Sequence, residues 1–329
     1  MRDWTLWHWV RQRDAELNGL GERIHRSGIY RAAGLMGRFS VVVAAFSYCW
    51  NSSEREKTRH YQAWQVIALA NSQAAGGGRI EALEDLVADG VPLAGIDLRK
   101  ALLRGVKLQG ADLRGALLDS ADLSRATLQK ADMSLARLNG AKLDSACLRG
   151  AFLHKAQLRS AQLGNGSLQG AILFDARLAS DSFSRERTSL AFANLEGADL
   201  RLADLEGVDL TGANLRNSSL MGAVLTDAEL EGADLRGTNL AGALMYRTGL
   251  RDVQNWKQVR SMDRTLLIAL EAVPDSFMEW ARAQGAFERK TTLLALTQFG
   301  QRRRFIRESA APPTPRVTTY LSSCRPNTR

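Results

Sequence analysis

Cysteine, histidine and proline are scarce in this chain of 329 residues, which has 3 Cys, 4 His and 6 Pro. Because Cys49, Cys147 and Cys324 lie far apart in the sequence, they argue against a disulfide framework and against a CxxC-type zinc cluster. As free thiols they would favour a reducing compartment. The His residues are equally scattered, so the sequence predicts neither a metal site nor a cofactor site.

The chain has instead a repeat of five residues: a small residue, any residue, Leu, and two mostly polar or glycine positions. One register covers 91–185 and a second covers 188–252, with Glu186 and Arg187 as two extra residues between them. Of the 32 central positions, 29 are Leu, and the residue two places earlier is Ala in 22 units. Only Asp181 puts a charge at that small position. The other central residues are Met133, Met245 and Phe183.

A period of five fits neither an α-helix nor an open strand. It fits a coil with four units per turn, in which Leu points inward from each side and the small residue fills each corner. Each residue then stacks on the one twenty positions earlier, at the strand spacing of ~4.8 Å, and the repeats give about eight turns. Glycine at the last place of many units suits tight corners. Proline is absent between Pro92 and Pro274, as backbone stacking requires.

The run of A(D/N)LXX units resembles the pentapeptide-repeat family. The resemblance implies a right-handed quadrilateral β-helix, an all-β solenoid, and it implies no particular function because such a scaffold carries unrelated surfaces. The polar residue before the central Leu is part of the repeat and needs no metal to explain it. Its Asp and Asn examples are Asp112, Asp122, Asp132, Asp199, Asp204, Asp209, Asn214 and Asp234.

The sequence divides the chain into five segments. A basic, aromatic helical segment at 1–52 is followed by a helical linker and cap at 53–90, and the solenoid occupies 91–252. A helical C-terminal cap at 253–300 and a basic tail at 301–329, with the composition of a disordered segment, complete the chain.

Both caps carry helix-end signals. Gly90 stands where the helix before the solenoid would end. Two short helical patterns lie in the C-terminal cap, split by Val273-Pro274, and Asp275 is placed to cap the second helix.

Residues 28–50 are the most apolar stretch outside the repeat. A membrane-spanning helix needs about 20 apolar residues, and Arg31 and Arg38 interrupt this stretch. The alternatives are a short or tilted membrane anchor and a helical hairpin that packs on the N-terminal cap. The segments HYQAW, GGRIEALEDL and WARAQGA are similar to the flanks of membrane-linked bacterial pentapeptide-repeat proteins of unassigned function.

Charge is unevenly distributed along the chain, whose net charge is +9. The first register has 14 Lys and Arg against 8 Asp and Glu, and the second has 5 against 10. Twenty-residue stacking places five basic side chains along one face, with Asp97 and Asp119 beside them. We interpret this face either as a solvated side of the coil or as a contact surface for an anionic partner such as lipid headgroups. Its basic residues are Arg99, Lys100, Arg137, Arg159 and Arg177.

The sequence gives no catalytic constellation. His154 and Cys147 stand at outward positions without an evident general base, and Gly76–Gly78 lacks the spacing of a phosphate-binding loop. The favoured function is a non-enzymatic scaffold for an unknown protein partner, held at a membrane with its solenoid in the cytoplasm; a soluble cytoplasmic protein is the alternative location. The alternative function is a soluble DNA mimic that inhibits or protects a topoisomerase, since some pentapeptide-repeat proteins imitate duplex DNA with an acidic rod. Nucleic acid is not expected as a partner, and the oligomeric state is left open.

Overall fold

The computed structural model describes residues 57–68, 78–180 and 187–288. The chain divides into two compact units, Met1–Gln62 and Ala63–Arg329. A helix covers residues 57–68, and helix α3 follows at Arg79–Ala88. Gly90 adopts a left-handed φ of 71° after α3, and the Val91 N–H donates to the Leu86 carbonyl, which ends the helix as the sequence predicts.

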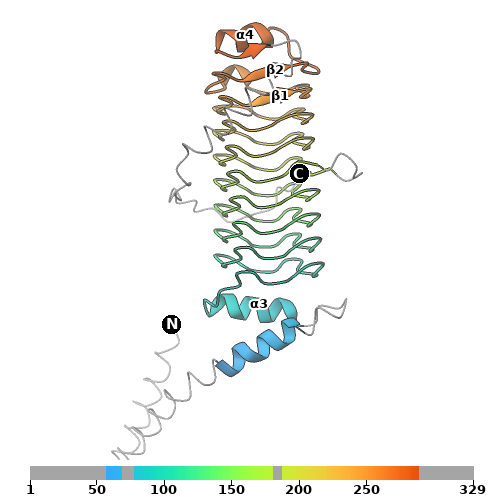
Figure 1. Ribbon diagram of the computed structural model, residues 1–329, viewed down its shortest axis with the longest axis vertical. Helices are drawn as coiled ribbons and strands as arrows, with labels where there is room; N and C mark the ends of the chain where they lie inside the picture. Colours follow the sequence, from blue (N-terminus) through green and yellow to red (C-terminus); the bar gives the residue numbers. More distant parts are fainter. Residues whose placement is uncertain (1–56, 69–77, 181–186, 289–329) are drawn as a thin grey trace, which may run out of the picture. The chain divides into compact units, whose positions relative to one another are not determined.

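The repeat forms a β-solenoid, a stack of four-sided coils between α3 and α4 (Phe277–Ala283) (Figure 1). Parallel bridges join residues twenty apart, beginning with Asp97–Leu117 and Leu102–Asp122. At each corner the N–H of the small residue donates to the preceding central carbonyl, as from Ala101 to Leu98. The residue before the corner takes a positive φ, which is 75° at Gly105.

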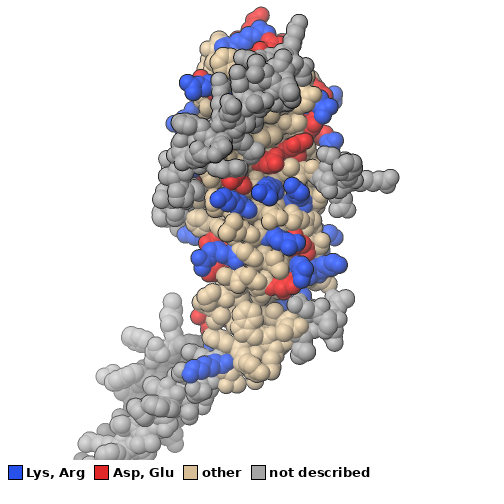
Figure 2. Space-filling view, in the orientation of Figure 1, with Lys and Arg blue, Asp and Glu red and all other residues tan. Residues whose placement is uncertain are grey.

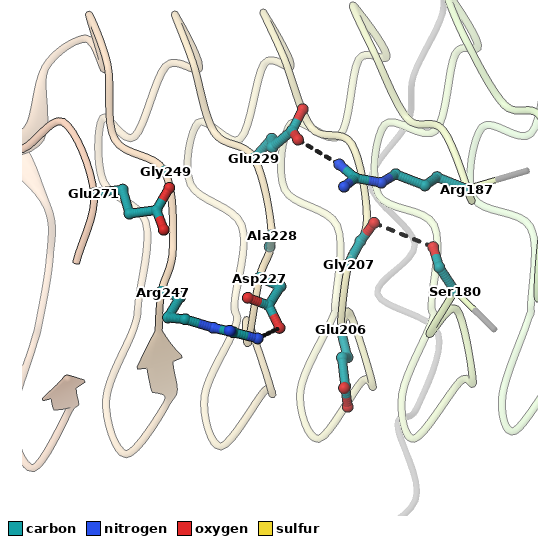
Figure 3. Close-up of a pocket in the computed structure, with 10 residues that line it drawn as sticks. All are labelled: Ser180, Arg187, Glu206, Gly207, Asp227, Ala228, Glu229, Arg247, Gly249 and Glu271. Carbon is teal, nitrogen blue, oxygen red and sulfur yellow. Dashed lines mark hydrogen bonds and ion pairs between the residues drawn. The ribbon is translucent and has the colours of Figure 1, made fainter. Parts of the chain in front are cut away.

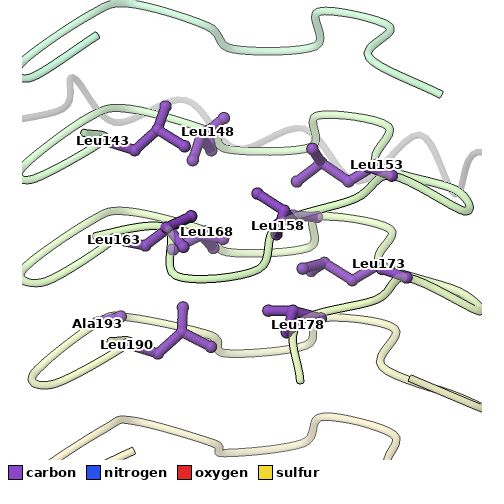
Figure 4. Packing of buried hydrophobic residues seen from close by; sticks show 14 of the residues in the cluster. Leu143, Leu148, Leu153, Leu158, Leu163, Leu168, Leu173, Leu178, Leu190 and Ala193 are labelled. Atoms are coloured by element: carbon purple, nitrogen blue, oxygen red, sulfur yellow. The ribbon is translucent and has the colours of Figure 1, made fainter. Parts of the chain in front are cut away.

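Leucine side chains from successive turns fill the interior of the coil (Figure 4). Leu143, Leu148, Leu153 and Leu158 are the central residues of four consecutive units, and each is at most 1% exposed. Corner alanines are buried between them. Thr238, Thr248 and Thr265 replace Ala at three corners, where each hydroxyl donates to the carbonyl of an earlier central Leu at 2.7–2.8 Å. A buried hydroxyl is therefore tolerated because it has a partner.

The polar residue before the central Leu has a structural role. Its side-chain oxygen accepts the backbone N–H two residues later, so it holds the turn at the corner. Seven of the eight residues singled out in the sequence make this bond, at 2.9–3.3 Å; they are Asp112, Asp122, Asp132, Asp199, Asp209, Asn214 and Asp234.

The insertion within the solenoid is longer than the sequence analysis expected. The bridge offset is 20 at Gln157–Arg177 but 27 at Gln162–Ser189, so seven residues, 181–187, separate the stacked units rather than two. The unit centred on Phe183 was therefore wrongly assigned to the coil. The physical reason is Asp181, whose carboxylate would have occupied a buried corner.

The coil also continues past residue 252. Strands β1 (Leu244–Tyr246), β2 (Leu266–Ile268) and β3 (Phe287–Glu288) pair in parallel, with Leu244 opposite Leu266 and Leu266 opposite Phe287. Leu266 and Leu267 thus belong to a strand, and the helical pattern predicted there was wrong.

A two-residue insertion next to the 3-10 helix η1 (Trp256–Gln258) hides the period in the sequence, since the bridge offset here is 22. The last helix also begins differently from the prediction. Ser276, with a left-handed φ of 62° and no side-chain capping bond, precedes α4 in place of Asp275.

Candidate binding surface

One face of the solenoid holds all five basic residues predicted from the sequence. It consists of the units that begin at residues 96, 116, 136, 156 and 176, and we call it the basic face. A bridge ladder runs through Asp97, Leu117, Arg137, Gln157 and Arg177. Arg99 and Arg159 follow central residues of the same units, and Lys100 lies at the corner after Arg99. The twenty-residue period alone aligns them.

Two of the five cations are neutralised within the face. Arg99 binds Asp97 through two hydrogen bonds of 2.9 and 2.6 Å, and Arg137 lies 2.8 Å from Asp119. The hydrogen bond from Arg99 lowers the pKa of the Asp97 carboxyl. These are surface pairs, since the Arg99 and Arg137 side chains are about half exposed.

Lys100, Arg159 and Arg177 have no ion-pair partner among the residues that the structure describes. Asn139 lies between Asp119 and Arg159 on this face. Its side-chain amide donates to the Asp119 carboxylate, and its side-chain oxygen accepts the backbone N–H of Arg159. On the side seen in Figure 2, Lys and Arg side chains lie among Asp and Glu. The basic face has a net positive charge that its own carboxylates do not cancel.

A pocket of about 580 Å³ lies where the same face continues beyond the insertion (Figure 3). Glu206, Asp227 and Arg247 come from this face, Glu229 and Glu271 come from the next one, and Arg187 is the last residue of the insertion. Arg247 points to Asp227 at 2.6 Å, and Arg187 pairs with Glu229. The pocket was not predicted, because it depends on where the seven-residue insertion rejoins the coil.

The charged side chains among the described residues that line the pocket are mostly acidic. Partial burial, together with the charges of Asp204 and Asp227, raises the pKa of the Glu206 carboxyl. The Ser180 hydroxyl donates to the Gly207 carbonyl and accepts the Thr188 N–H, so it joins the two ends of the coil on either side of the insertion. Within the described ranges no group of three or more His, Cys, Asp or Glu is placed to hold a metal ion.

Two other sequence predictions change here. Cys147, taken as a free thiol, is disulfide-bonded and only 5% exposed, so the argument for a reducing compartment loses its support. His154 is half-buried and stacks on Phe174 with ring centroids 5.4 Å apart. Burial lowers the pKa of His154.

No helix in the described part of the chain is long and apolar enough to cross a membrane, and the segment 28–50 lies outside that part.

Comparison with known proteins agrees with the repeat geometry. The sequence model of pentapeptide repeats matches eight copies, over residues 96–134, 136–175, 186–222 and 203–242. The chain therefore contains pentapeptide repeats, and the matched residues make up less than half of its length. No curated protein matches the chain.

Solved structures with similarity to the chain include two pentapeptide-repeat proteins of cyanobacteria. HetL, involved in heterocyst differentiation regulation in Nostoc sp. strain PCC 7120, is 29% identical; the match covers 62% of this chain and 90% of HetL, with a TM-score of 0.35. Rfr23 of Cyanothece 51142 is 32% identical over 32% of this chain and 58% of its own, with a TM-score of 0.14.

Full-length QnrB1, a plasmid-mediated fluoroquinolone resistance protein, is also similar. It is 17% identical over 63% of this chain and 94% of QnrB1, with a TM-score of 0.22. TM-scores of this size carry no conclusion about function.

Proposed function

We propose that this protein is a non-catalytic scaffold that binds an acidic protein partner through the basic face. The supporting observation is the stacking of Lys100, Arg159 and Arg177 on one side of a rigid coil, with no ion-pair partner in the described ranges. Buried leucine and alanine side chains fill the interior of the described coil, and the described residues of the surface pocket place no nucleophile beside a base. We also take the coil to be right-handed, with its terminal helices as caps, as the family resemblance implies.

An acidic protein suits this face better than a lipid surface. Membrane-surface segments combine basic residues with apolar side chains that enter the headgroup layer. Between the arginines of the basic face lie Leu117, Asn139, Gln157 and Ala179, and Leu117, the one large apolar side chain among them, is partly buried. Exposed charges on a rigid face instead steer encounter and orient a partner of opposite charge.

DNA mimicry finds less support. The second register has the acidic excess that such a mimic needs, but ion pairs occupy four of its carboxylates. Asp199 pairs with Arg201 and Asp234 pairs with Arg216, each within 2.7 Å. In the pocket, Glu229 pairs with Arg187 and Asp227 pairs with Arg247. The remaining acidic charge covers only part of the coil.

Photo-crosslinking in cells tests the proposal. A photoreactive residue at Gln157, on the basic face, should capture a protein that the same residue at Gln109, on the opposite side of the coil, does not. The double variant Arg159→Glu, Arg177→Glu should weaken capture about tenfold, because two exposed ionic contacts each contribute up to ~1 kcal/mol. Arg104→Glu, Arg125→Glu changes the net charge equally on a neighbouring face and should leave capture intact.

Equal loss in both double variants would mean that only net charge matters, and the basic face would not be the binding surface. Binding of the purified protein to phosphatidylserine vesicles, lost in the first double variant and kept in the second, would replace the protein partner by a membrane.

A further inference from the structure

The side of the coil that carries the basic face changes sign along its length. Beyond the insertion this side continues with the units that begin at residues 203, 223 and 243, and we call these three units the acidic extension. They contain Asp204, Glu206 and Asp227 against Arg247, a net charge of −2. The basic face has five Lys and Arg against two Asp, a net charge of +3. One side of the coil therefore carries both signs, in two separate parts.

The change of sign occurs between two adjacent turns near the middle of the ladder. Arg177, in the last unit of the basic face, is the bridge partner of Asp204, in the first unit of the acidic extension. Four bridge steps lead from Asp97 to Arg177, and four more lead from Asp204 to Phe287. At ~4.8 Å per step the ladder is about 43 Å long, with the Arg177–Asp204 step at its centre.

The acidic extension has two carboxylates that are available to a cation. Glu206 is exposed and Asp204 is half-buried, and neither forms an ion pair within the described ranges, where Arg247 is engaged by Asp227 at 2.6 Å. Partial burial, together with the charges of Asp204 and Asp227, raises the pKa of the Glu206 carboxyl, so the local potential is negative. A cation supplied by another molecule would be stabilised here.

The basic face has the complementary set of groups. Lys100, Arg159 and Arg177 are exposed and have no ion-pair partner in the part of the chain that the structure describes. If two copies of the chain met side by side in parallel orientation, these cations would face each other and repel. In antiparallel orientation the basic face of each copy would instead meet the acidic extension of the other.

Two-fold symmetry makes this match twice. A two-fold axis perpendicular to the coil at the Arg177–Asp204 step reverses the second copy and aligns the two ladders over their whole length, because four steps lie on each side of that step. Arg177 of each copy then lies opposite Asp204 of the other, and the turn of Arg159 lies opposite the turn of Asp227. Such an interface is isologous, so every favourable contact occurs twice.

Spacing also favours a second copy over an unrelated acidic protein. The cations of the basic face lie on turns separated by ~4.8 Å, and a partner has to present carboxylates at matching intervals. The acidic extension is built from the same turns with the same offset of twenty residues, so its carboxylates have this spacing. The chain therefore contains the acidic surface that its own basic face requires.

We infer that the acidic partner of the basic face is a second copy of this chain, bound side by side in antiparallel orientation with the basic face of each copy on the acidic extension of the other. The inference rests on the proposed function and adds the identity of the partner. The α3 end of each coil then lies beside the α4 end of the other.

Sedimentation velocity of the purified full chain tests the association. The chain should form a dimer whose dissociation constant rises at least about tenfold between about 0.1 M and about 1 M salt, because the Debye length falls from about 10 Å to about 3 Å. A chain that stays monomeric at low salt would overturn the inference, as would a dimer whose dissociation constant does not depend on salt.

Charge reversal identifies the two surfaces. Arg159→Glu, Arg177→Glu and, separately, Asp204→Lys, Glu206→Lys should each weaken the dimer at least about tenfold, since each double variant places like charges opposite each other. An equimolar mixture of the two double variants should form a mixed dimer with a dissociation constant within about threefold of the parent's, because opposite charges face each other again. A misfolded variant could not give this rescue, and its absence would overturn the inference.

The matched control lies on the neighbouring face. Arg104→Glu, Arg125→Glu changes the net charge by the same amount as the first double variant and should leave the dimer intact. Equal weakening in this control would mean that net charge, and not the basic face, governs association, which would also overturn the inference.

Photo-crosslinking separates this inference from the proposed function. In cells that express two differently tagged copies, a photoreactive residue at Gln157 should capture the other copy, with the attachment site inside 203–247. Attachment within 91–180 of the other copy would contradict the antiparallel orientation and overturn the inference. Capture of a different protein alone, lost in Arg159→Glu, Arg177→Glu, would overturn the inference and leave the proposed function standing, whereas capture of no protein would overturn both.

Discussion

At the scale of single residues, the corners impose a backbone strain that only some side chains relieve. Glycine takes the left-handed conformation without steric cost, but many last places hold other residues, including Lys100 (φ 57°) and Leu135 (φ 62°). A left-handed conformation costs an L-residue roughly 1–2 kcal/mol. The repeat accepts this cost because layers of buried leucine and the ladder bonds define the corner.

Leu135→Gly should therefore stabilise the protein. Its side chain is largely exposed, so the substitution removes strain at small loss of burial, and the free energy of unfolding should rise by about 0.5–1 kcal/mol in chemical denaturation. Leu102→Gly is the control, because Leu102 is similarly exposed but lies in a β-bridge with an ordinary φ. The free energy of unfolding of Leu102→Gly should fall by about as much as that of Leu135→Gly rises. A lower free energy of unfolding in both variants would show that corner strain is negligible.

The sequence predicted the residue roles well where they depend on the repeat alone. Central Leu, corner Ala and the polar residue before Leu all occupy the expected places, because their roles follow from a local pattern repeated many times. Cys147 was misjudged for the opposite reason: a disulfide joins residues far apart in sequence, and spacing gives no information about it.

At the scale of elements, the insertion at 181–187 is fastened at both ends without disturbing the coil. Thr188 binds Ser180 through its N–H and the Leu158 carbonyl through its hydroxyl, and Gln162 donates to the Arg187 carbonyl. The units on either side stack as if they were consecutive. The fold therefore does not require the insertion.

Deleting residues 181–187 should leave the unfolding temperature within about 4 °C of the parent, since the described contacts that it removes are an exposed ion pair worth up to ~1 kcal/mol and the exposed Gln162 hydrogen bond. Deleting residues 178–184 removes the same number of residues but takes out the buried Leu178 and places Arg185 at a central position. This control should cost at least about 2–5 kcal/mol. Differential scanning calorimetry distinguishes the two, and similar losses would place 181–187 within the packed structure.

Element boundaries were the weak point of the sequence analysis. Asp181 at a corner position signalled the break in the period, but nothing local gives the length of an insertion. After residue 252 the coil keeps its inward positions with Met262 and Leu267, while η1 shifts the register by two residues. The period that identified the other turns is lost there, so a strand was mistaken for a helix. The pocket beside Arg187 was missed because it depends on this three-dimensional register.

At the scale of the whole molecule, a stacked coil has open backbone groups at its last turn unless something covers them. Trp256, Phe277 and Trp280 pack together at the C-terminal end, with ring centroids 5.3–6.0 Å apart. Phe277 is 1% exposed and joins the main core, so it connects α4 to the leucine stack.

Phe277→Ala should loosen this end by about 3–5 kcal/mol, because it empties a fully buried aromatic site. Hydrogen exchange should accelerate in β2 and β3 but not in the central turns, since each turn of a solenoid contacts only its neighbours. Light scattering should also show association through the uncovered edge. Phe192→Ala, at a site 60% exposed, is the control and should change neither the hydrogen-exchange rates nor the light scattering. A uniform increase in exchange rates along the coil would contradict the nearest-neighbour behaviour.

The twenty-residue bridge offset has a consequence for how such a molecule can change in length. Duplicating any twenty consecutive residues of the regular part would insert one complete turn, keep every existing side chain on its own face and move the two ends apart by ~4.8 Å. The spacing between the basic face and the acidic pocket could thus be reset in fixed steps, without redesign of either. The length of the coil is therefore set by the number of twenty-residue turns in the sequence.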